Sequence, residues 1–350
     1  MNTKKRINWL EISFLALLLA LFLWWFIPVK LAKNENRAGT GTDTMSAKPT
    51  KKQFSAVSLE ARSAYVLDAE TGAALYEKEP ELQWPMASLA KLMVVFTASR
   101  LVPDYMLVRI TSDDVMEEGD TGLLIGEEWN IKKLIDYSLV VSSNDGIRAI
   151  AGAAGAEIAS AARIDSVSSA IPASFHSPPA LSSPVPLPAS HLSSSRSVPA
   201  VPAETLFVES MNKLARETGL TQTYFLNQSG LDLSGNLSGG YSSAKDVALL
   251  MREILKTNAH MLEATSFSKI NIDSKNKIHA AVNTNKTLEK IPNVLASKTG
   301  YTELSGGNVV VVFNAGLDRP VVISVMGSSY DGRFSDLHAL ADATLEYFSK

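Results

Sequence analysis

The chain alternates short apolar runs of strand length with longer stretches in which apolar residues recur at helical spacing. Two pairs of apolar runs are joined by Gly-containing turns, a pattern that predicts hairpins. The hairpins are expected to join 64–68 to 73–76 and 308–314 to 320–326. Further short strands are expected at 107–111 and 121–124, and helices at 86–101, 131–141, 207–218, 243–256 and 337–348. Because the hairpins lie at the two ends with helices between them, we expect an α+β fold in which helices flank one antiparallel sheet built from both ends.

The N-terminus has a different pattern from the rest of the chain. Lys4, Lys5 and Arg6 precede an apolar run over 12–29, which is long enough to span a bilayer. We therefore expect residues 1–33 to form a cytoplasmic tip and an uncleaved transmembrane helix, with a cleaved signal peptide as the alternative. Positive charge before the span favours a cytoplasmic N-terminus. The remaining residues are then expected on the extracytoplasmic side, in the periplasm or the cell wall, tethered to the cytoplasmic membrane.

Two further segments lack the pattern of a folded domain. Residues 34–55 are polar and without periodicity, as expected of a flexible linker. A Ser/Pro/Ala-rich stretch at about 160–204 is expected to be a disordered insertion, because eight of the chain's 15 prolines fall within it. A single domain over 56–350, interrupted by this insertion, is expected to be the functional part.

Composition excludes several kinds of chemistry. The sequence has no Cys, so disulfides, thiol catalysis and cysteine-based metal sites are excluded. Its five His residues show no metal-ligand spacing, and we expect no metal and no cofactor. The net charge is −3 and the basic residues are scattered, which argues against a nucleic-acid partner.

A Ser and a Lys lie three residues apart at the start of the helix expected at 86–101. On a helix, positions i and i+3 share a face, so the Ser88 hydroxyl and the Lys91 amine are expected side by side. A serine hydroxyl is a weak nucleophile until a base takes its proton, and a lysine serves as that base when burial or nearby positive charge lowers its pKa. The pair is therefore a candidate nucleophile and base.

Two more short motifs follow in order, Ser142-Ser-Asn144 and Lys298-Thr-Gly300. Acyl transfer needs a nucleophile, a base, a proton path to the leaving amine and donors for the developing oxyanion. Ser142 offers a hydroxyl that could relay a proton between Lys91 and the leaving group. Lys298, expected ahead of a strand, adds positive charge that favours a neutral Lys91 and attracts an anionic substrate end. Gly300 is expected to let a substrate backbone approach closely.

The ordered set S-x-x-K, S-x-N and K-T-G resembles the motifs of the low-molecular-mass penicillin-binding proteins, the D-alanyl-D-alanine carboxypeptidase family of serine peptidases. The resemblance continues at 65–72, 227–232, 241–246 and 297–302. It implies a β-lactamase/transpeptidase-like fold with a helical lobe beside the sheet. The sequence departs from the family at two positions. Ser143 replaces a Gly that is common in the family, and its side chain could crowd the substrate. Gln228 replaces the usual Pro.

The resemblance also implies roles for the motif residues. Ser88 would be the acylated nucleophile and Lys91 its base, with Ser142 as proton relay. Asn144 would contact a substrate amide, and the backbone N–H groups of Ser88 and Tyr301 would bind the oxyanion. The other implied residues lie on or beside the substrate-binding strand: Lys298, Thr299, Gly300 and Arg333, the last at the position that binds a terminal carboxylate.

The implied function is a serine-type D-Ala-D-Ala carboxypeptidase that acts on peptidoglycan stem peptides in the cell wall and is inhibited covalently by β-lactams. A D,D-endopeptidase that cuts cross-links would use the same site. A class A β-lactamase would need a Glu-x-x-Leu-Asn loop, and none occurs between Ser142 and Lys298. A non-catalytic cell-wall binding homologue is the alternative from a different class.

Overall fold

The computed structural model describes residues 52–119, 121–170 and 201–349, with the backbone alone over 163–170. The predicted transmembrane anchor, nearly all of the linker and most of the insertion lie outside these residues. Within the described residues, none of the helices combines the length and the apolar character that a membrane span requires.

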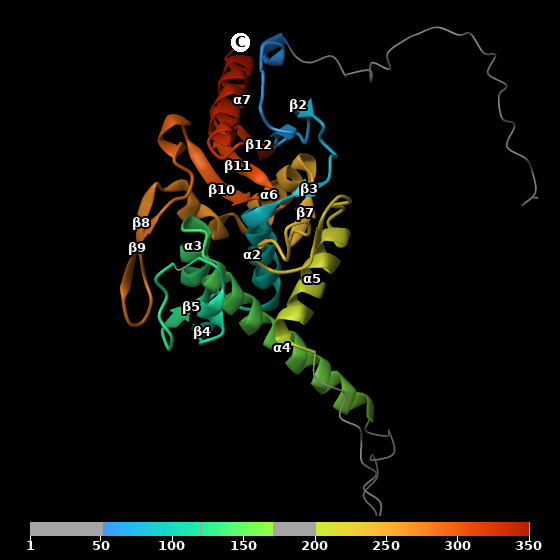
Figure 1. Cartoon of the computed structure of the whole chain (residues 1–350), viewed down its shortest axis with the longest axis vertical. Helices are drawn as coiled ribbons and strands as arrows, with labels where there is room; N and C mark the ends of the chain where they lie inside the picture. Colours follow the sequence, from blue (N-terminus) through green and yellow to red (C-terminus); the bar gives the residue numbers. More distant parts are fainter. Residues whose placement is uncertain (1–51, 120, 171–200, 350) are drawn as a thin grey trace, which may run out of the picture. The chain divides into compact units, whose positions relative to one another are not determined.

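A five-stranded antiparallel sheet forms the centre of the domain, in the order β10-β11-β12-β1-β2 (Figure 1). The strands are β1 (Ser63–Asp68), β2 (Ala74–Lys78), β10 (Val294–Thr302), β11 (Gly306–Asn314) and β12 (Pro320–Ser328). β1 pairs with β12, with Tyr65 opposite Ser324. The prediction of one sheet assembled from both ends of the chain is therefore confirmed, and β10 lies at its edge.

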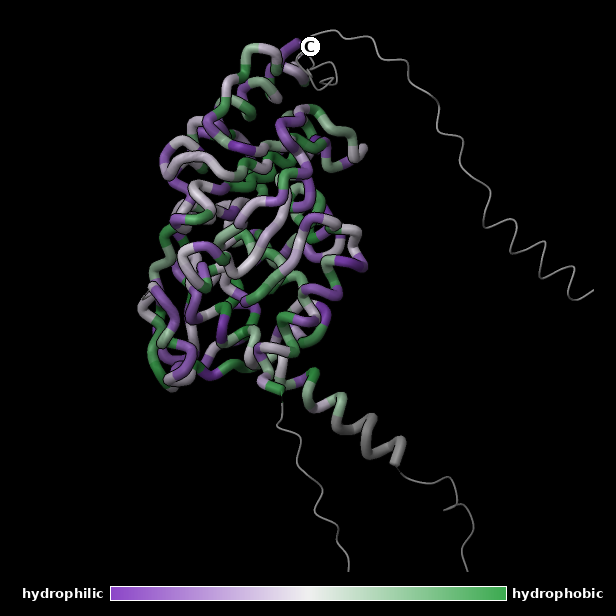
Figure 2. Tube along the Cα trace, turned by 45° about the vertical axis from the view of Figure 1, so that its right-hand side comes forward, coloured by the Kyte–Doolittle hydropathy of each residue, from purple (hydrophilic) through white to green (hydrophobic). Residues whose placement is uncertain are grey.

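The alternation of side chains along the strands separates two cores. In β11, Val310 and Val312 face one hydrophobic cluster, whereas Val309 and Val311 face the other. Helix α6 (Ala244–Asn258) packs in the first cluster and α7 (Gly332–Phe348) in the second. Both faces of the sheet are covered, so the sequences of the central strands β11 and β12 are almost continuously apolar. Figure 2 shows this as hydrophobic colouring along the strands.

The helices on the side of the first cluster form the predicted helical lobe. Its middle element, α2 (Ala90–Leu101), is buried almost throughout and contacts the neighbouring helices (Figure 1). Those neighbours are α3 (Ile131–Val140), α4 (Asn144–Ala170), α5 (Ala203–Glu217) and α6. Three small sheets complete the fold: β3 (Trp84–Pro85) with β7 (Gly240–Ser242) and β6 (Tyr224–Phe225), β4 (Leu107–Arg109) with β5 (Glu128–Asn130), and β8 (Lys269–Asp273) with β9 (Ile278–Val282).

Several predicted elements and boundaries are wrong. Residues 121–124 form no strand, because Gly122 and Gly126 adopt positive φ angles in turns, and β5 pairs with β4 instead. The helix expected at 86–101 starts as a 3-10 turn, η2 (Ala87–Leu89), and its α-helical part begins at Ala90. The folded domain begins before residue 56, because Phe54 is buried in the second core.

A further error concerns the insertion. Helix α4 continues to Ala170 and so covers residues 160–170 of the segment expected to be disordered. The reason is visible in the sequence, since the first proline after α4 begins is Pro172 and the residues before it are mostly Ala and Ser, which a helix accommodates. Residues 171–200 lie outside the described chain.

Two glycines of α4 give a matched test of how closely α4 and α5 pack. A Cβ at Gly155 would lie 2.0 Å from the Ala203 carbonyl oxygen, whereas a Cβ at Gly152 would meet its nearest atom at 3.8 Å. Gly155→Ala is expected to lower the free energy of unfolding by about 1–3 kcal/mol, because the helices must separate. Gly152→Ala is expected to raise it by about 0.5–1 kcal/mol through helix propensity. Urea unfolding of both variants measures the difference, and equal effects would contradict this packing.

Candidate active site

Ser88 lies in the tight turn η2, where β3 leads into α2. The turn requires Ala87 to adopt a φ of 46°, in the left-handed region that disfavours side chains. Met86 N donates to the Gly240 carbonyl at 3.0 Å, which ties the turn to β7. The Ser88 side chain is partly exposed at this point, so it is accessible to a ligand.

Lys91, three residues beyond Ser88, is completely buried. Its Nζ donates to Ser88 Oγ at 2.8 Å, to Asn144 Oδ1 at 2.7 Å and to the Ser229 carbonyl at 3.1 Å. Burial lowers the pKa of Lys91 to about 7, against an opposing effect of Glu117. A large fraction of Lys91 is therefore neutral near pH 7, and it contacts the hydroxyl whose proton it would accept.

Ser142 follows the end of α3 and precedes α4, and its φ of 61° is in the left-handed region. Its Oγ accepts a hydrogen bond from Lys298 Nζ at 2.9 Å. The motif pattern predicts that Ser142 relays a proton from Lys91, whereas the hydrogen bond in the structure is with Lys298. Ser142 therefore connects the second motif to the third.

Ser143 does not point into the site. It is completely buried, and its Oγ accepts from Gly146 N at 3.0 Å and contacts Thr121 Oγ1 at 2.7 Å. The first of these bonds caps the start of α4. The expectation that Ser143 could crowd the substrate is therefore wrong, because its side chain serves the helix instead.

Lys298 lies within β10 rather than ahead of a strand, and it is also buried. Burial lowers the pKa of Lys298 well below its ordinary value, and the charges of Lys91 and Arg333 lower it further. The charge of Lys91 therefore disfavours the charged form of Lys298. The effect predicted from the sequence ran the other way, from Lys298 to Lys91, whereas burial is what lowers the pKa of Lys91.

Gly300 and its neighbours in β10 border the turn that carries Ser88. A Cβ at Gly300 would lie 3.0 Å from both Met86 O and Ser88 N. The glycine is therefore needed for contact with the nucleophile's own turn, and not only for the approach of a substrate as predicted. Thr299 is buried and donates from Oγ1 to Thr284 Oγ1 at 2.6 Å, whereas Tyr301 is 46% exposed.

Arg333, near the start of α7, is buried behind β10. Its Nη1 donates to the Gly300 carbonyl at 2.9 Å, and its guanidinium lies 4.5 Å from the ring centre of Tyr330 and 4.7 Å from that of Phe334. The structure therefore places Arg333 beside the third motif, as predicted, and gives it a structural bond to the strand as well.

Three groups around Lys91 and Asn144 were not predicted from the sequence. Ser229 contributes a backbone carbonyl to Lys91, and the Glu118 carbonyl accepts from Asn144 Nδ2 at 2.6 Å. Glu117 acts on Lys91 through its charge. The resemblance at 227–232 marked the first segment without giving it a role, but nothing in the sequence pattern indicated Glu117 or Glu118.

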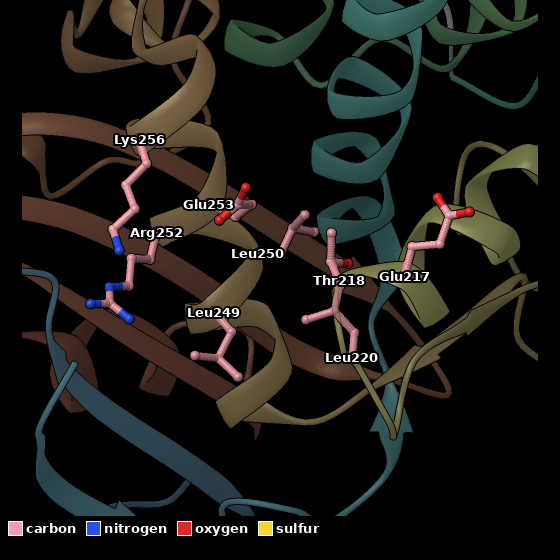
Figure 3. Close-up of a pocket in the computed structure, with 8 residues that line it drawn as sticks. All are labelled: Glu217, Thr218, Leu220, Leu249, Leu250, Arg252, Glu253 and Lys256. Atoms are coloured by element: carbon pink, nitrogen blue, oxygen red, sulfur yellow. The ribbon is translucent and has the colours of Figure 1, made fainter.

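A pocket of about 380 Å³ lies elsewhere, between the end of α5 and the outer face of α6 (Figure 3). The residues that line it are Glu217, Thr218, Leu220, Leu249, Leu250, Arg252, Glu253 and Lys256. None of the predicted site residues is among them. The chemistry of Ser88 and Lys91 therefore belongs to a different part of the molecule.

Comparison with known proteins agrees with this geometry. The family model described as D-alanyl-D-alanine carboxypeptidase matches residues 48–159 and 201–329, so the match omits the insertion. D-alanyl-D-alanine carboxypeptidase DacF of Bacillus subtilis is 26% identical over 293 residues. These residues are 82% of this chain, but the chain spans only 58% of the length of DacF.

Solved structures show the same fold. A D-alanyl-D-alanine carboxypeptidase from Mycobacterium tuberculosis H37Rv has a TM-score of 0.63 at 20% identity, covering 87% of this chain and 95% of its own. Penicillin-binding protein D2 from Listeria monocytogenes, in its ampicillin-bound form, has a TM-score of 0.58 at 22% identity, covering 82% of this chain and 98% of its own. The expected transpeptidase-like arrangement of helices and sheet is therefore confirmed.

The state of Lys91 can be measured directly. Protein labelled with ¹³Cε-lysine should show one resonance that titrates with a midpoint of about 7 and is lost in Lys91→Arg. In urea-unfolded protein the same group should titrate near its ordinary value of about 10.4, because burial is removed. A folded-state midpoint near that ordinary value would contradict the assignment of Lys91 as a base.

Proposed function

The chain belongs to the D-alanyl-D-alanine carboxypeptidase family, and we propose that it is a serine-type D-Ala-D-Ala carboxypeptidase that trims peptidoglycan stem peptides through an acyl-enzyme on Ser88. The observation that carries this proposal is the 2.8 Å contact between Ser88 Oγ and the buried amine of Lys91. A serine beside a lysine whose pKa is about 7 is an activated nucleophile.

In the acylation step, neutral Lys91 accepts the Ser88 proton as Oγ attacks the carbonyl of the penultimate D-alanine. The oxyanion that forms needs preorganised donors. The backbone N–H groups of Ser88 and Tyr301 are assigned this role, which is supported by the close approach of Gly300 to Ser88 N. The bond between the two D-alanines then breaks, and the leaving amine takes up a proton.

The proton reaches the leaving amine through the second and third motifs. Ser142 Oγ accepts a hydrogen bond from Lys298 Nζ at 2.9 Å, so Lys298 holds the hydroxyl that donates to the amine. The proton that Lys91 took from Ser88 replaces the one that Ser142 donates, and Lys91 becomes neutral again. Deacylation reverses these roles. Water attacks the acyl-enzyme, Lys91 accepts the water's proton, and Ser88 Oγ is released with a proton restored to it.

The substrate peptide is proposed to bind along β10. This strand lies at the edge of the sheet, and an edge strand presents unpaired backbone groups to an extended peptide. Thr299 and Gly300 line that position. Arg333 is proposed to attract the terminal carboxylate, while the free N–H of the Asn144 amide contacts the substrate backbone.

The same site suits β-lactams, which present a strained amide to a serine nucleophile. The ampicillin-bound form of penicillin-binding protein D2 from Listeria monocytogenes supports this assignment by analogy. An endopeptidase acting on cross-links would use the same residues and is the second candidate. A binding-only homologue is disfavoured, because it would not require Ser88, Lys91, Ser142 and Lys298 to be paired as they are.

The location of the enzyme is proposed from the sequence alone. The apolar run over 12–29, preceded by three basic residues, favours a single-pass anchor in the cytoplasmic membrane. The catalytic domain would then lie on the extracytoplasmic side, where peptidoglycan is found. Cleavage of the span as a signal peptide would leave the domain on the same side.

The proposal is tested by release of D-alanine from a synthetic pentapeptide that ends in D-Ala-D-Ala. Ser88→Ala is expected to abolish release, and Ser142→Ala is expected to lower kcat/KM by about 10²–10⁴-fold because a proton-transfer group is lost. Ser143→Ala is the matched control, since that hydroxyl caps α4 and should leave kcat/KM almost unchanged.

A cross-linked peptide dimer is tested in parallel. Cleavage of the dimer without release of D-alanine would favour the endopeptidase. If the wild-type protein is soluble and folded but cleaves neither substrate, the proposed function is contradicted.

A further inference from the structure

The irregular segment 117–119 is attached to the first turn of α4 at two positions. Glu118 O accepts from Asn144 Nδ2 at 2.6 Å, and Glu117 Oε1 pairs with Arg148 Nη1 at 2.7 Å. Asn144 and Arg148 are four residues apart, so they lie on the same face of the helix. Two consecutive residues of an irregular segment are thus fixed to one helical surface beside the reaction centre.

Asn144 transmits this attachment to the base. Its Oδ1 accepts from Lys91 Nζ at 2.7 Å, and the carboxamide is planar, so the direction of Nδ2 fixes the direction of Oδ1. Because Glu118 O takes one amide hydrogen, Oδ1 faces Lys91 and one N–H remains for substrate. If the segment moved, the amide could rotate and both contacts would be lost.

We propose that Glu117 and Arg148 are positioning residues for acylation: their ion pair holds the segment that orients Asn144, and it sets how much negative charge acts on Lys91. The inference rests on the proposed function and adds residues that the three motifs do not contain. Neither residue touches the reacting atoms, so their effect passes through Asn144 and Lys91.

Charged groups lie on two sides of Lys91. Glu117 favours its protonated form, whereas Lys298 on β10, itself close to Arg333, has its own pKa lowered by the charge of Lys91. Arg148 on α4 partly neutralises Glu117, because the two charges are paired with their side chains only partly exposed. Removal of Glu117 and removal of Arg148 should therefore change the pKa of Lys91 in opposite directions.

Glu204 on α5 supplies a matched control. Its Oε1 lies 3.7 Å from Arg148 Nη2, so it shares the same arginine. However, Glu204 has no bond to the segment 117–119 or to Asn144 in the part of the chain that the structure describes. Glu204→Gln removes one negative charge from beside Arg148, as Glu117→Gln does, but it leaves the segment 117–119 attached to α4.

The test is the rate of acylation of the full-length chain by a fluorescent penicillin, measured from about pH 5 to pH 9. Glu117→Gln is expected to shift the midpoint of the acidic limb down by about half a unit to one unit. Arg148→Gln is expected to shift it up, because Glu117 then acts uncompensated. Both variants should lower the plateau rate by about tenfold, because Asn144 is no longer held. Glu204→Gln should match the wild type in both respects.

The inference is overturned if Glu117→Gln and Arg148→Gln move the midpoint in the same direction, or if Glu204→Gln behaves like Glu117→Gln. Thermal unfolding checks that each variant is folded. The ¹³Cε resonance of Lys91 gives the same midpoints without any acylation. A wild type that is not acylated would therefore overturn the proposed function, whereas the NMR midpoints would still decide the roles of Glu117 and Arg148.

Discussion

The contact between the turn at Ser88 and the edge strand β10 is the constraint on which the rest of the site depends. Ala87 takes a left-handed conformation, and a Cβ at Gly230 would collide with the Ala87 carbonyl oxygen at 2.0 Å. A Cβ at Gly300 would lie only 3.0 Å from Ser88 N. Gly300 therefore allows the start of α2 to approach β10, and Gly230 allows the 227–232 loop to approach the same turn. The approach of α2 to β10 brings the Ser88 hydroxyl and the Lys91 amine next to a strand that can bind a peptide. No sequence motif taken alone produces that arrangement.

Burial of two lysines gives the site its chemistry. An isolated ammonium group is costly to bury, so a lysine without a carboxylate partner tends to lose its proton. Lys91 is surrounded by neutral acceptors, namely Ser88, Asn144 and the Ser229 carbonyl, while Glu117 acts from farther away. On the other side, burial and the charge of Lys91 lower the pKa of Lys298. Burial thus gives Lys91 an uncharged amine that can accept the Ser88 proton near neutral pH.

Elements with strong periodicity were predictable, and contacts between distant irregular segments were not. The valine runs of β11 and β12 identify buried strands whatever they pack against. The i, i+3 spacing predicted the contact between Ser88 and Lys91, whereas Lys298 lies within β10 and not ahead of a strand as predicted. The attachment of Glu118 to Asn144 joins an irregular segment to a helix 26 residues away. No spacing rule encodes that bond, so only the three-dimensional structure reveals it.

The proposed reaction depends on a covalent acyl-enzyme at Ser88, which intact-mass spectrometry after exposure to a β-lactam detects. The wild-type mass is expected to increase by one drug molecule, whereas Ser88→Ala, treated identically, is expected to keep its original mass. A wild type that gains no mass at any drug concentration, or an adduct that persists in Ser88→Ala, would rule out an acyl-enzyme on Ser88.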